Sequence, residues 1–425
     1  MEGKEHVPRE STRPMLRVPI TYAKPGMMLA MPIRHPQRPE HLLLQVGYEL
    51  DQAAIGRLRE LRLREVWIRY PNLEFIGKYI NPHILEEQAK VGKAIGGALE
   101  TVMRDTTAKL NYPAFKSTIR DFIDKLLEDP QAAIFIEEIS ETDEPLLRHS
   151  CSVCFLSLLM GLKLEGYLVQ QRRRLAAHRA KDVVNLGVGA MLHDVGMMRI
   201  DAKARERWMK THDESDPAWR EHVIIGYQLV QGHVEPSASA AVLHHHQRYD
   251  GAGFPVRREA DGVLRGLVGD RIHIFPRIVA TADLFDRMRH PPDRATPTPV
   301  VRALRRMQTP EIASRMDPMT YKALIAVTPP YPPGSLVTLS NGVRGVVTEW
   351  RPSDPCRPTV QKLGDIEQDH AKNGAAPNAA CYDLRSDHTL HVVEAEGERV
   401  LEDNFYPKRV EEYTIDLDGR GFLAA

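Results

Sequence analysis

Cysteine is scarce in this sequence, which has four cysteines among 425 residues. So low a content excludes a secreted scaffold that depends on disulfide bonds. Two of the four, Cys151 and Cys154, have the CxxC spacing of some zinc and redox sites. Such a site needs partner ligands or an exposed helix start, and neither is evident nearby, so we expect two small core residues.

The chain also lacks a net charge, because 57 Lys and Arg residues balance 57 Asp and Glu residues. A balanced surface argues against nucleic acid or an anionic membrane as the main partner. No uninterrupted apolar run reaches the roughly 18 residues of a membrane span. The polar start at residues 1–8 lacks the apolar core of a secretion signal. We therefore expect a cytoplasmic protein without a membrane span, built from about two or three domains.

The stretch from Val188 to Pro255 is rich in side chains that bind metal ions. Its metal-competent residues are His193, Asp194, His222, His245 and His246. Imidazole nitrogen and carboxylate oxygen suit iron, manganese, zinc or nickel, and a carboxylate can bridge two ions whereas an imidazole cannot. Asp194 is therefore the candidate bridge.

The residues from 183 to 195, around His193 and Asp194, predict a nearly all-apolar helix, which is typical of a helix buried in a core. Its apolar residues are Val183, Val184, Leu186, Val188, Met191, Leu192 and Val195. A buried carboxylate without a partner is strongly unfavourable, so Asp194 at this depth needs a cation or a strong donor. The alternative is a hydrogen-bonded His–Asp pair at a helix end, which would be the better interpretation for an isolated pair.

Two more polar residues interrupt apolar helices upstream and downstream. His149 lies in the apolar run Leu146–Met160, and Asp283 shares a helix face with Val279. Each has a structural alternative, which is a satisfied core histidine for His149 and an i,i+4 ion pair with Arg287 for Asp283. Together with the central stretch they give the order H, HD, H, HH, D.

This ordered set resembles the HD-GYP branch of the HD superfamily, which comprises bacterial metal-dependent phosphohydrolases that act on cyclic di-GMP. The resemblance covers roughly residues 130 to 315. It implies one metal held by His149, His193, Asp194 and Asp283. It further implies a second metal that Asp194 shares with His222, His245 and His246, which leaves His244 out.

The resemblance implies two divalent ions, with iron or manganese expected and zinc, nickel or magnesium as alternatives. A third ion in some members uses a glutamate at the position that Pro145 occupies here, with Glu144 beside it. It also implies hydrolysis of cyclic di-GMP to pGpG, and further to GMP, by water that two metal ions activate. A homodimer and a signalling protein bound at the loop Gly253–Pro255 are further partners to expect.

Three positions depart from the family pattern. Met197 replaces a lysine that contacts phosphate, Gln247 replaces a glutamate, and Phe254 replaces the tyrosine of the GYP motif. Arginines that could compensate are Arg199, Arg277 and Arg294, because guanidinium binds phosphate bidentately. We take Arg277 and the permissive glycines Gly251 and Gly253 as substrate-binding candidates.

These departures motivate an alternative function. The protein would then be a metal-bound cyclic di-GMP receptor or signalling scaffold with little turnover. A second alternative keeps the chemistry and changes the substrate to another nucleotide or phosphoester. No residue pattern in the sequence indicates guanine recognition.

The expected fold is mainly α, with an HD-type helical bundle, a small α+β module before it and a β-rich region after it. The predicted divisions are a tail without order at 1–16, the α+β module at 17–82, a helical linker at 83–130, the HD-GYP-like domain at 131–315 and the β-rich region at 316–425. Asn341–Gly342 between apolar runs predicts a hairpin. Residues 367–378 predict a flexible insertion, and 201–220 a surface loop that nothing apolar holds in place.

Overall fold

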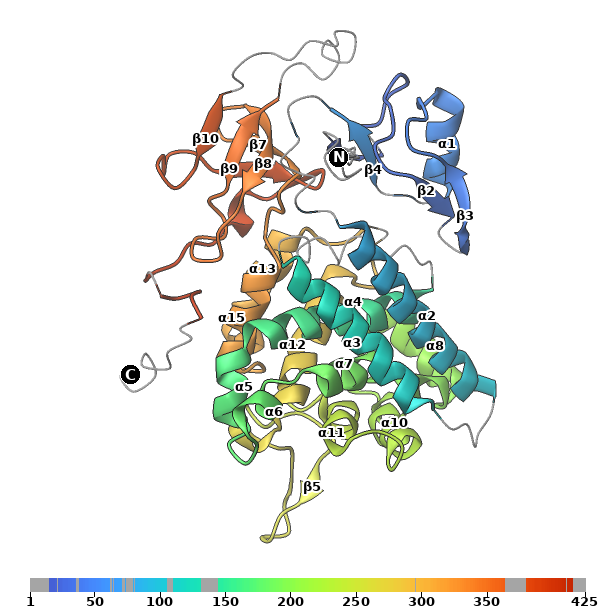
Figure 1. The fold of residues 1–425 in the computed structure, drawn as a ribbon. Coiled ribbons are helices and arrows are strands. Elements are labelled where there is room, and N and C mark those ends of the chain that lie inside the picture. Colours follow the sequence, from blue (N-terminus) through green and yellow to red (C-terminus); the bar gives the residue numbers. More distant parts are fainter. Residues whose placement is uncertain are drawn as a thin grey trace, which may run out of the picture.

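The computed structural model describes most of the chain. The described residues are 15–20, 22–35, 38–61, 63, 65–70, 73, 79, 81–104, 110–130, 144–294, 296–363, 380–409 and 411–415. The predicted tail, apart from its last two residues, and the predicted insertion at 367–378 lie outside the described residues. A helical bundle forms the body, with a small N-terminal module and a C-terminal sheet beside each other at one end (Figure 1).

The N-terminal module is α+β, as the sequence predicted. Strand β1 pairs antiparallel with β4, and β2 pairs antiparallel with β3. Helix α1 begins after Asp51, whose carboxylate accepts a hydrogen bond from the amide of Ala54 and thereby caps the helix. The elements are β1 (Met15–Pro19), β2 (Ile33–His35), β3 (Arg38–Leu44), α1 (Gln52–Glu60) and β4 (Glu65–Arg69).

Helix α4 (Pro145–Lys163) is the central helix of the bundle. It packs against α7 (Val184–Met191), α12 (Ile274–Arg289) and α15 (Pro318–Val327). By length and composition alone, α4 passes the test for a membrane span, although 72% of the qualifying window is buried. A core helix passes the same test, and the burial of α4 among three other helices fits that role.

The first two long helices, α2 (Pro82–Arg104) and α3 (Tyr112–Glu128), are part of this bundle. The sequence left open whether they form a linker or the first helices of the bundle, and their buried faces share one core with α4 and α7. Val91 and Ile119, for example, are completely buried. Helix α15, which lies beyond the predicted boundary at residue 315, also packs against α4 and α12.

The segment at 201–220 is folded, which corrects the prediction of a loose surface loop. It contains α8 (Ala202–Thr211) and α9 (Pro217–Arg220). The rings of Trp208 and Trp219 stack with centroids 3.7 Å apart, and both side chains are buried. This aromatic pair fixes the turn between the two helices, because large buried rings supply much of the packing in so short a segment.

The remaining bundle elements connect these helices. They are α5 (Glu165–Gln171), α6 (Ala177–Ala180), η4 (Val195–Met198), α10 (His222–Val230), α11 (Pro236–His244), η5 (Gly269–Arg271), α13 (Val300–Met307) and α14 (Pro310–Ala313). A short hairpin, β5 (Arg257–Arg258) and β6 (Leu264–Arg265), projects from the end of the bundle far from the N-terminal module (Figure 1).

The C-terminal region forms a sheet of six strands in the order β10-β9-β8-β7-β11-β12, with antiparallel neighbours. The predicted hairpin is confirmed, since β7 and β8 flank Asn341 and Gly342, the latter with φ +82°. The elements are β7 (Leu336–Leu339), β8 (Arg344–Glu349), β9 (Thr359–Lys362), β10 (Cys381–Asp383), β11 (Val392–Ala395), β12 (Glu398–Arg399) and η6 (Leu401–Asp403).

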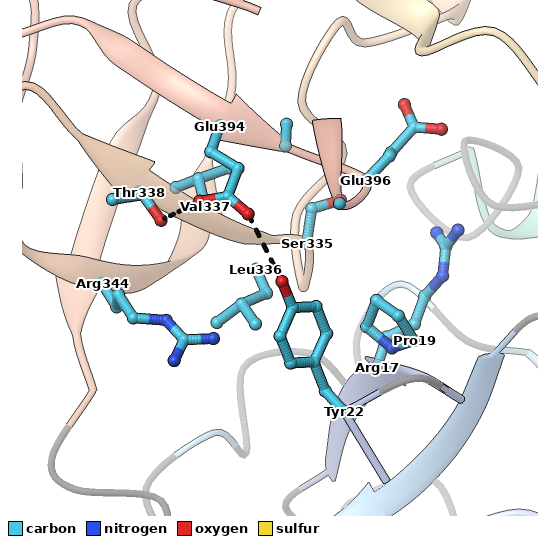
Figure 2. Close-up of a pocket in the computed structure, with 12 residues that line it drawn as sticks. Arg17, Pro19, Tyr22, Ser335, Leu336, Val337, Thr338, Arg344, Glu394 and Glu396 are labelled. Atoms are coloured by element: carbon cyan, nitrogen blue, oxygen red, sulfur yellow. Dashed lines mark hydrogen bonds between the residues drawn. The ribbon is translucent and has the colours of Figure 1, made fainter. Parts of the chain in front are cut away.

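This sheet touches both other parts of the molecule. Val346 shares a core with the N-terminal module, whereas Val347 belongs to the core of the bundle. Figure 2 shows Tyr22 of the module reaching Glu394 of β11, with 3.3 Å between the hydroxyl and a carboxylate oxygen. On the bundle side, Arg289 at the end of α12 pairs with Glu396 at 3.0 Å.

Candidate metal centre

The carboxylate of Asp194 lies between two groups of histidines. Its Oδ1 atom is 3.4 Å from Nε2 of His222 and 3.5 Å from Nε2 of His245. Its Oδ2 atom is 3.7 Å from Nε2 of His149 and 3.6 Å from Nε2 of His193. Each carboxylate oxygen therefore faces one pair of imidazoles, which is the arrangement that a bridging ligand requires.

Two overlapping sets of metal-competent atoms result. One contains Asp194, His222, His245 and His246, and the other contains His149, His193 and Asp194; within each set the atoms lie within 4.8 Å of one another. Asp283 joins the second set through its Oδ1 atom, 3.2 Å from Nε2 of His149. The structure thus brings together all seven residues that the sequence singled out as metal-ligand candidates.

Backbone carbonyls fix three of the imidazole rings. The Nδ1 atoms lie 2.8 Å from the Ala190 oxygen in His193, 2.7 Å from the Trp219 oxygen in His222 and 2.8 Å from the Val242 oxygen in His245. In each case the carbonyl belongs to the residue three positions earlier. A proton on Nδ1 leaves the lone pair of Nε2 free, so these contacts select the tautomer that binds a metal.

His149 has a carboxylate behind it instead of a carbonyl. Its Nδ1 atom is 2.6 Å from Oδ2 of Asp286, one turn along α12 from Asp283. Asp286 is buried and is also 3.2 Å from His290. Sequence reasoning missed Asp286, although its spacing of three residues from Asp283 places both on one helix face.

Gly196 allows the segment after Asp194 to approach α10 closely. A Cβ atom at Gly196 would lie 2.0 Å from the backbone oxygen of His222 and 2.6 Å from the amide nitrogen of Gly226. A Cβ at Gly226 would in turn meet a methyl group of Val242 at 3.0 Å. The two glycines therefore permit close packing of the backbone beside His222.

The charge states suit a cation. Burial lowers the pKa of both His193 and His222 to about 4, so both are neutral near pH 7. Burial works to raise the pKa of Asp194, but the surrounding histidines, His193 first, hold it well below its usual value. Burial also opposes charge on His149, yet Asp283 and Asp286 outweigh it and raise the pKa of His149 to about 10. The anionic carboxylate of Asp194 beside the neutral imidazoles of His193 and His222 is a donor set for a divalent ion, whereas His149 must release its proton to bind one.

A pocket of about 560 Å³, open solvent included, lies over the side of the cluster that contains His245 and His246. The arginines in its wall are Arg220, Arg248, Arg287 and Arg315. Sequence reasoning did not select this set for phosphate binding. The pair between Arg287 and Asp283, which was the structural alternative for Asp283, is present at 2.6 Å.

The three arginines expected to compensate for the missing lysine lie elsewhere, since none is among the described residues that line this pocket. Arg277, a predicted substrate-binding residue, is buried and pairs with Asp317 at 2.7 Å and with Asp270 at 2.9 Å. Arg294 pairs with Glu398 of the C-terminal sheet. The geometry therefore gives Arg277 a structural role that ties α12 to the start of α15.

The glycine loop forms another wall of the pocket. Gly253 lines it and has no room for a side chain, because a Cβ would lie 2.4 Å from the His246 oxygen. Gly251 has φ +86° and lies against Val268. The Phe254 ring stacks on His246 with centroids 4.9 Å apart, so the residue that replaces tyrosine packs directly on the cluster.

Two other departures from the family pattern serve packing and loop structure. Met197 is 1% exposed and belongs to the bundle core. The side chain of Gln247 donates to the Pro255 oxygen at 2.6 Å and accepts from the Leu267 amide at 2.7 Å. Both positions are therefore used to hold the loop and core beside the cluster.

Part of the chain matches a known protein family. The HD domain family model matches residues 146–288, the range that contains the whole histidine and aspartate cluster. This match, together with the buried histidine and aspartate cluster, supports a metal-dependent phosphohydrolase that contains an HD domain.

The chain is also similar to individual known proteins. The chain is 25% identical over 380 residues to the cyclic di-GMP phosphodiesterase PA4108 of Pseudomonas aeruginosa, covering 81% of this chain and 84% of the relative. It is 36% identical over 113 residues to the cyclic di-GMP phosphodiesterase response regulator RpfG of Xanthomonas campestris, covering 25% and 27%. A solved structure of Bd1817, an HDG"Y"P protein of Bdellovibrio bacteriovorus, aligns with a TM-score of 0.41 at 16% identity, over 73% of this chain and 98% of that one.

Proposed function

We propose that this protein hydrolyses cyclic di-GMP to linear pGpG, and further to GMP, with a dinuclear metal centre. The observation that carries the proposal is the position of Asp194, whose two oxygens each face a different pair of imidazoles. Two relatives whose names are cyclic di-GMP phosphodiesterases support the choice of substrate.

The donor set fits two divalent ions. We assign one ion to His149, His193, Asp194 and Asp283, and the other to Asp194, His222, His245 and His246. Iron or manganese suits this mixture of imidazole and carboxylate, and zinc, nickel or magnesium is the alternative. When bound, such ions supply a nucleophile from water near neutral pH and neutralise charge on the phosphoryl oxygens.

The residues of the chain provide position and charge around these ions. Backbone carbonyls and Asp286 orient the imidazoles before any ligand arrives, which reduces reorganisation on binding. The pocket arginines face an anionic substrate, and guanidinium groups match the geometry of phosphate oxygens. The rings of Phe254 and Trp219, 5.5 Å apart, both pack against His246.

A second candidate function is a metal-bound receptor for cyclic di-GMP with little turnover. The burial of Met197 and the two hydrogen bonds of Gln247 favour it, because neither side chain contributes a proton donor or a cation to the pocket. The two functions share the same ligand and the same metal residues. They differ in whether the bound phosphodiester is cleaved.

Metal analysis of protein purified without air, followed by a product assay, separates the two. We expect two ions per chain, and linear product in the presence of iron or manganese. A panel with other cyclic dinucleotides tests the substrate. Tight nucleotide binding without product would establish the receptor, and a chain that retains no metal at all would refute the dinuclear assignment.

We also propose a revised division of the chain. The N-terminal module begins with β1 at residue 15 and precedes α2, which begins at residue 82. The packing of α2, α3 and α15 on the central helices supports one helical domain from residue 82 to about residue 327, which is followed by the C-terminal sheet.

A further inference from the structure

A carboxylate of the chain itself occupies the arginines of the pocket. Glu214, in the turn between α8 and α9, lies 2.7 Å from Nη1 of Arg287 and 3.2 Å from Nη1 of Arg315. Its two oxygens are divided between the two arginines. Arg287 also pairs with Asp283, so Glu214 is connected through Arg287 to one of the metal-ligand candidates.

The turn holds Glu214 in this place. The Nε atom of Arg220 donates to the backbone oxygen of Glu214 at 2.7 Å. His212 adopts a left-handed conformation with φ +48° and stacks on Trp208, which itself stacks on Trp219. The carboxylate is therefore aimed into the pocket by a structured turn, and its side chain is 34% exposed.

The two arginines retain unused donors. Among the described residues, the buried Nε atoms of Arg287 and Arg315 have no hydrogen-bond partner. Burial works to raise the pKa of Glu214, but Arg287 and Arg315 outweigh it and lower that pKa. The site thus contains two guanidinium groups, the carboxylates of Glu214 and Asp283, and spare N–H donors beside the metal-ligand candidates.

We propose that Glu214 is an internal competitor for the substrate phosphate. A phosphodiester carries one negative charge on two non-bridging oxygens, as a carboxylate does, and it matches the same guanidinium donors. Arg287 and Arg315 are then phosphate-binding residues that take over the part of the lysine absent at Met197. This inference rests on the proposed function, because it places a phosphodiester in that pocket.

The direction in which one substitution changes the affinity for phosphate tests whether Glu214 competes with phosphate. Glu214→Gln in the full-length protein keeps the size of the side chain and removes its charge. We expect the affinity for inorganic phosphate, measured by titration calorimetry at a measured metal content, to rise about tenfold, since a charge-assisted contact no longer competes. If Glu214 instead served to organise the arginines, the same substitution would weaken phosphate binding.

Two further variants control this measurement. Glu206→Gln removes the same charge from an exposed site on α8, where Glu206 pairs with Lys210, and it should leave phosphate affinity unchanged. In the double variant with Glu214→Gln and Arg315→Gln, most of the gain in phosphate affinity should be lost. An equal gain in Glu206→Gln would reduce the effect to general electrostatics and overturn the proposal.

The cyclic di-GMP assay keeps the two proposals apart. With competition, Glu214→Gln lowers KM for cyclic di-GMP in parallel with the gain in phosphate affinity. If the unmodified protein hydrolyses cyclic di-GMP but Glu214→Gln does not bind phosphate more tightly, the proposed competition by Glu214 is overturned and the proposed activity stands. A phosphate gain without hydrolysis in any variant would overturn the proposed activity and support the competition.

Discussion

The two halves of the histidine cluster differ in what lies behind the rings. In the His149 half, the carboxylates of Asp283 and Asp286 lie 3.2 Å and 2.6 Å from the two nitrogens of His149. In the His222 half, backbone carbonyls orient His222 and His245, and aromatic rings surround His222 and His246. One half is supported by charge and the other by packing.

This difference predicts unequal metal affinity. A carboxylate behind an imidazole increases its basicity and adds negative charge near the cation, whereas a carbonyl mainly fixes the tautomer. In the His222 half, Asp194 faces His222 and His245, and Asp283 approaches His246 only to 3.9 Å. We therefore expect the His149 half to bind its ion more tightly, with Asp194 essential to both.

Asp194→Ala removes what the two halves share, so it has the largest expected effect. Both ions should be lost, with hydrolysis reduced about a thousandfold or more, because the metals provide most of the charge stabilisation. His193→Ala should behave similarly, and the fold should be largely retained in both. Metal analysis and circular dichroism check this, with the exposed Asp213→Ala as control. Unchanged metal content would disprove the ligand assignment.

His222→Ala separates the halves. The variant should retain about one ion per chain, held by the His149 half, because it keeps the carboxylates near that site. His149→Ala should lower the affinity of both ions, since it removes the ring that lies against Asp194 and Asp283. Competition with a chelator measures the two affinities. Identical behaviour of both variants would mean that the halves are not independent.

Sequence reasoning predicted much of this cluster because its signals are local. A single polar residue in an apolar helix, as at His149 and Asp283, marks a side chain directed into a core. The order of these residues along the chain then carries the family resemblance, which implies that they meet in one site. Gly226 and the hairpin at Asn341–Gly342 were likewise predictable from backbone chemistry within a few residues.

The features that sequence reasoning missed depend on contacts between distant segments. Arg277 pairs with Asp317, forty positions later, and Glu214 meets Arg287 and Arg315 from a separate turn. No local periodicity encodes such pairs. The two tryptophans at 208 and 219 were the available signal that the segment around Glu214 is anchored, since tryptophan side chains are usually buried and packed.

Gly196→Ala breaks the His222 half without touching a ligand. The new methyl group would lie 2.0 Å from the His222 oxygen and force α10 away from Asp194. We expect destabilisation of about 3 kcal/mol and loss of the ion of the His222 half. Thermal unfolding and metal analysis measure both. Gly97→Ala is the matched control, because its Cβ meets nothing within 4 Å on α2; it should stabilise the helix by about 0.5–1 kcal/mol.

Met197→Lys tests whether the lysine of the family pattern can be restored. The side chain at 197 is 1% exposed and packs in the core. We expect a loss of about 2 kcal/mol in stability, because a buried ammonium is poorly solvated. Met197→Leu should cost less than about 1.5 kcal/mol. A stable lysine variant with higher turnover would show that this position reaches the substrate.

Asp286→Asn has the smallest expected effect and gives the sharpest test of the charge-supported half. The amide has nearly the same shape, so the His149 ring should stay in place while the negative charge behind it is lost. Removing such a partner typically lowers metal affinity about 10–100-fold, and we expect this loss at the His149 half alone. Chelator competition that resolves the two ions would measure it, with Asp270→Asn as a control on a carboxylate that pairs with Arg277 away from the cluster. Equal weakening of both ions would show that charge spreads across the Asp194 bridge, and that the two halves act as one electrostatic unit.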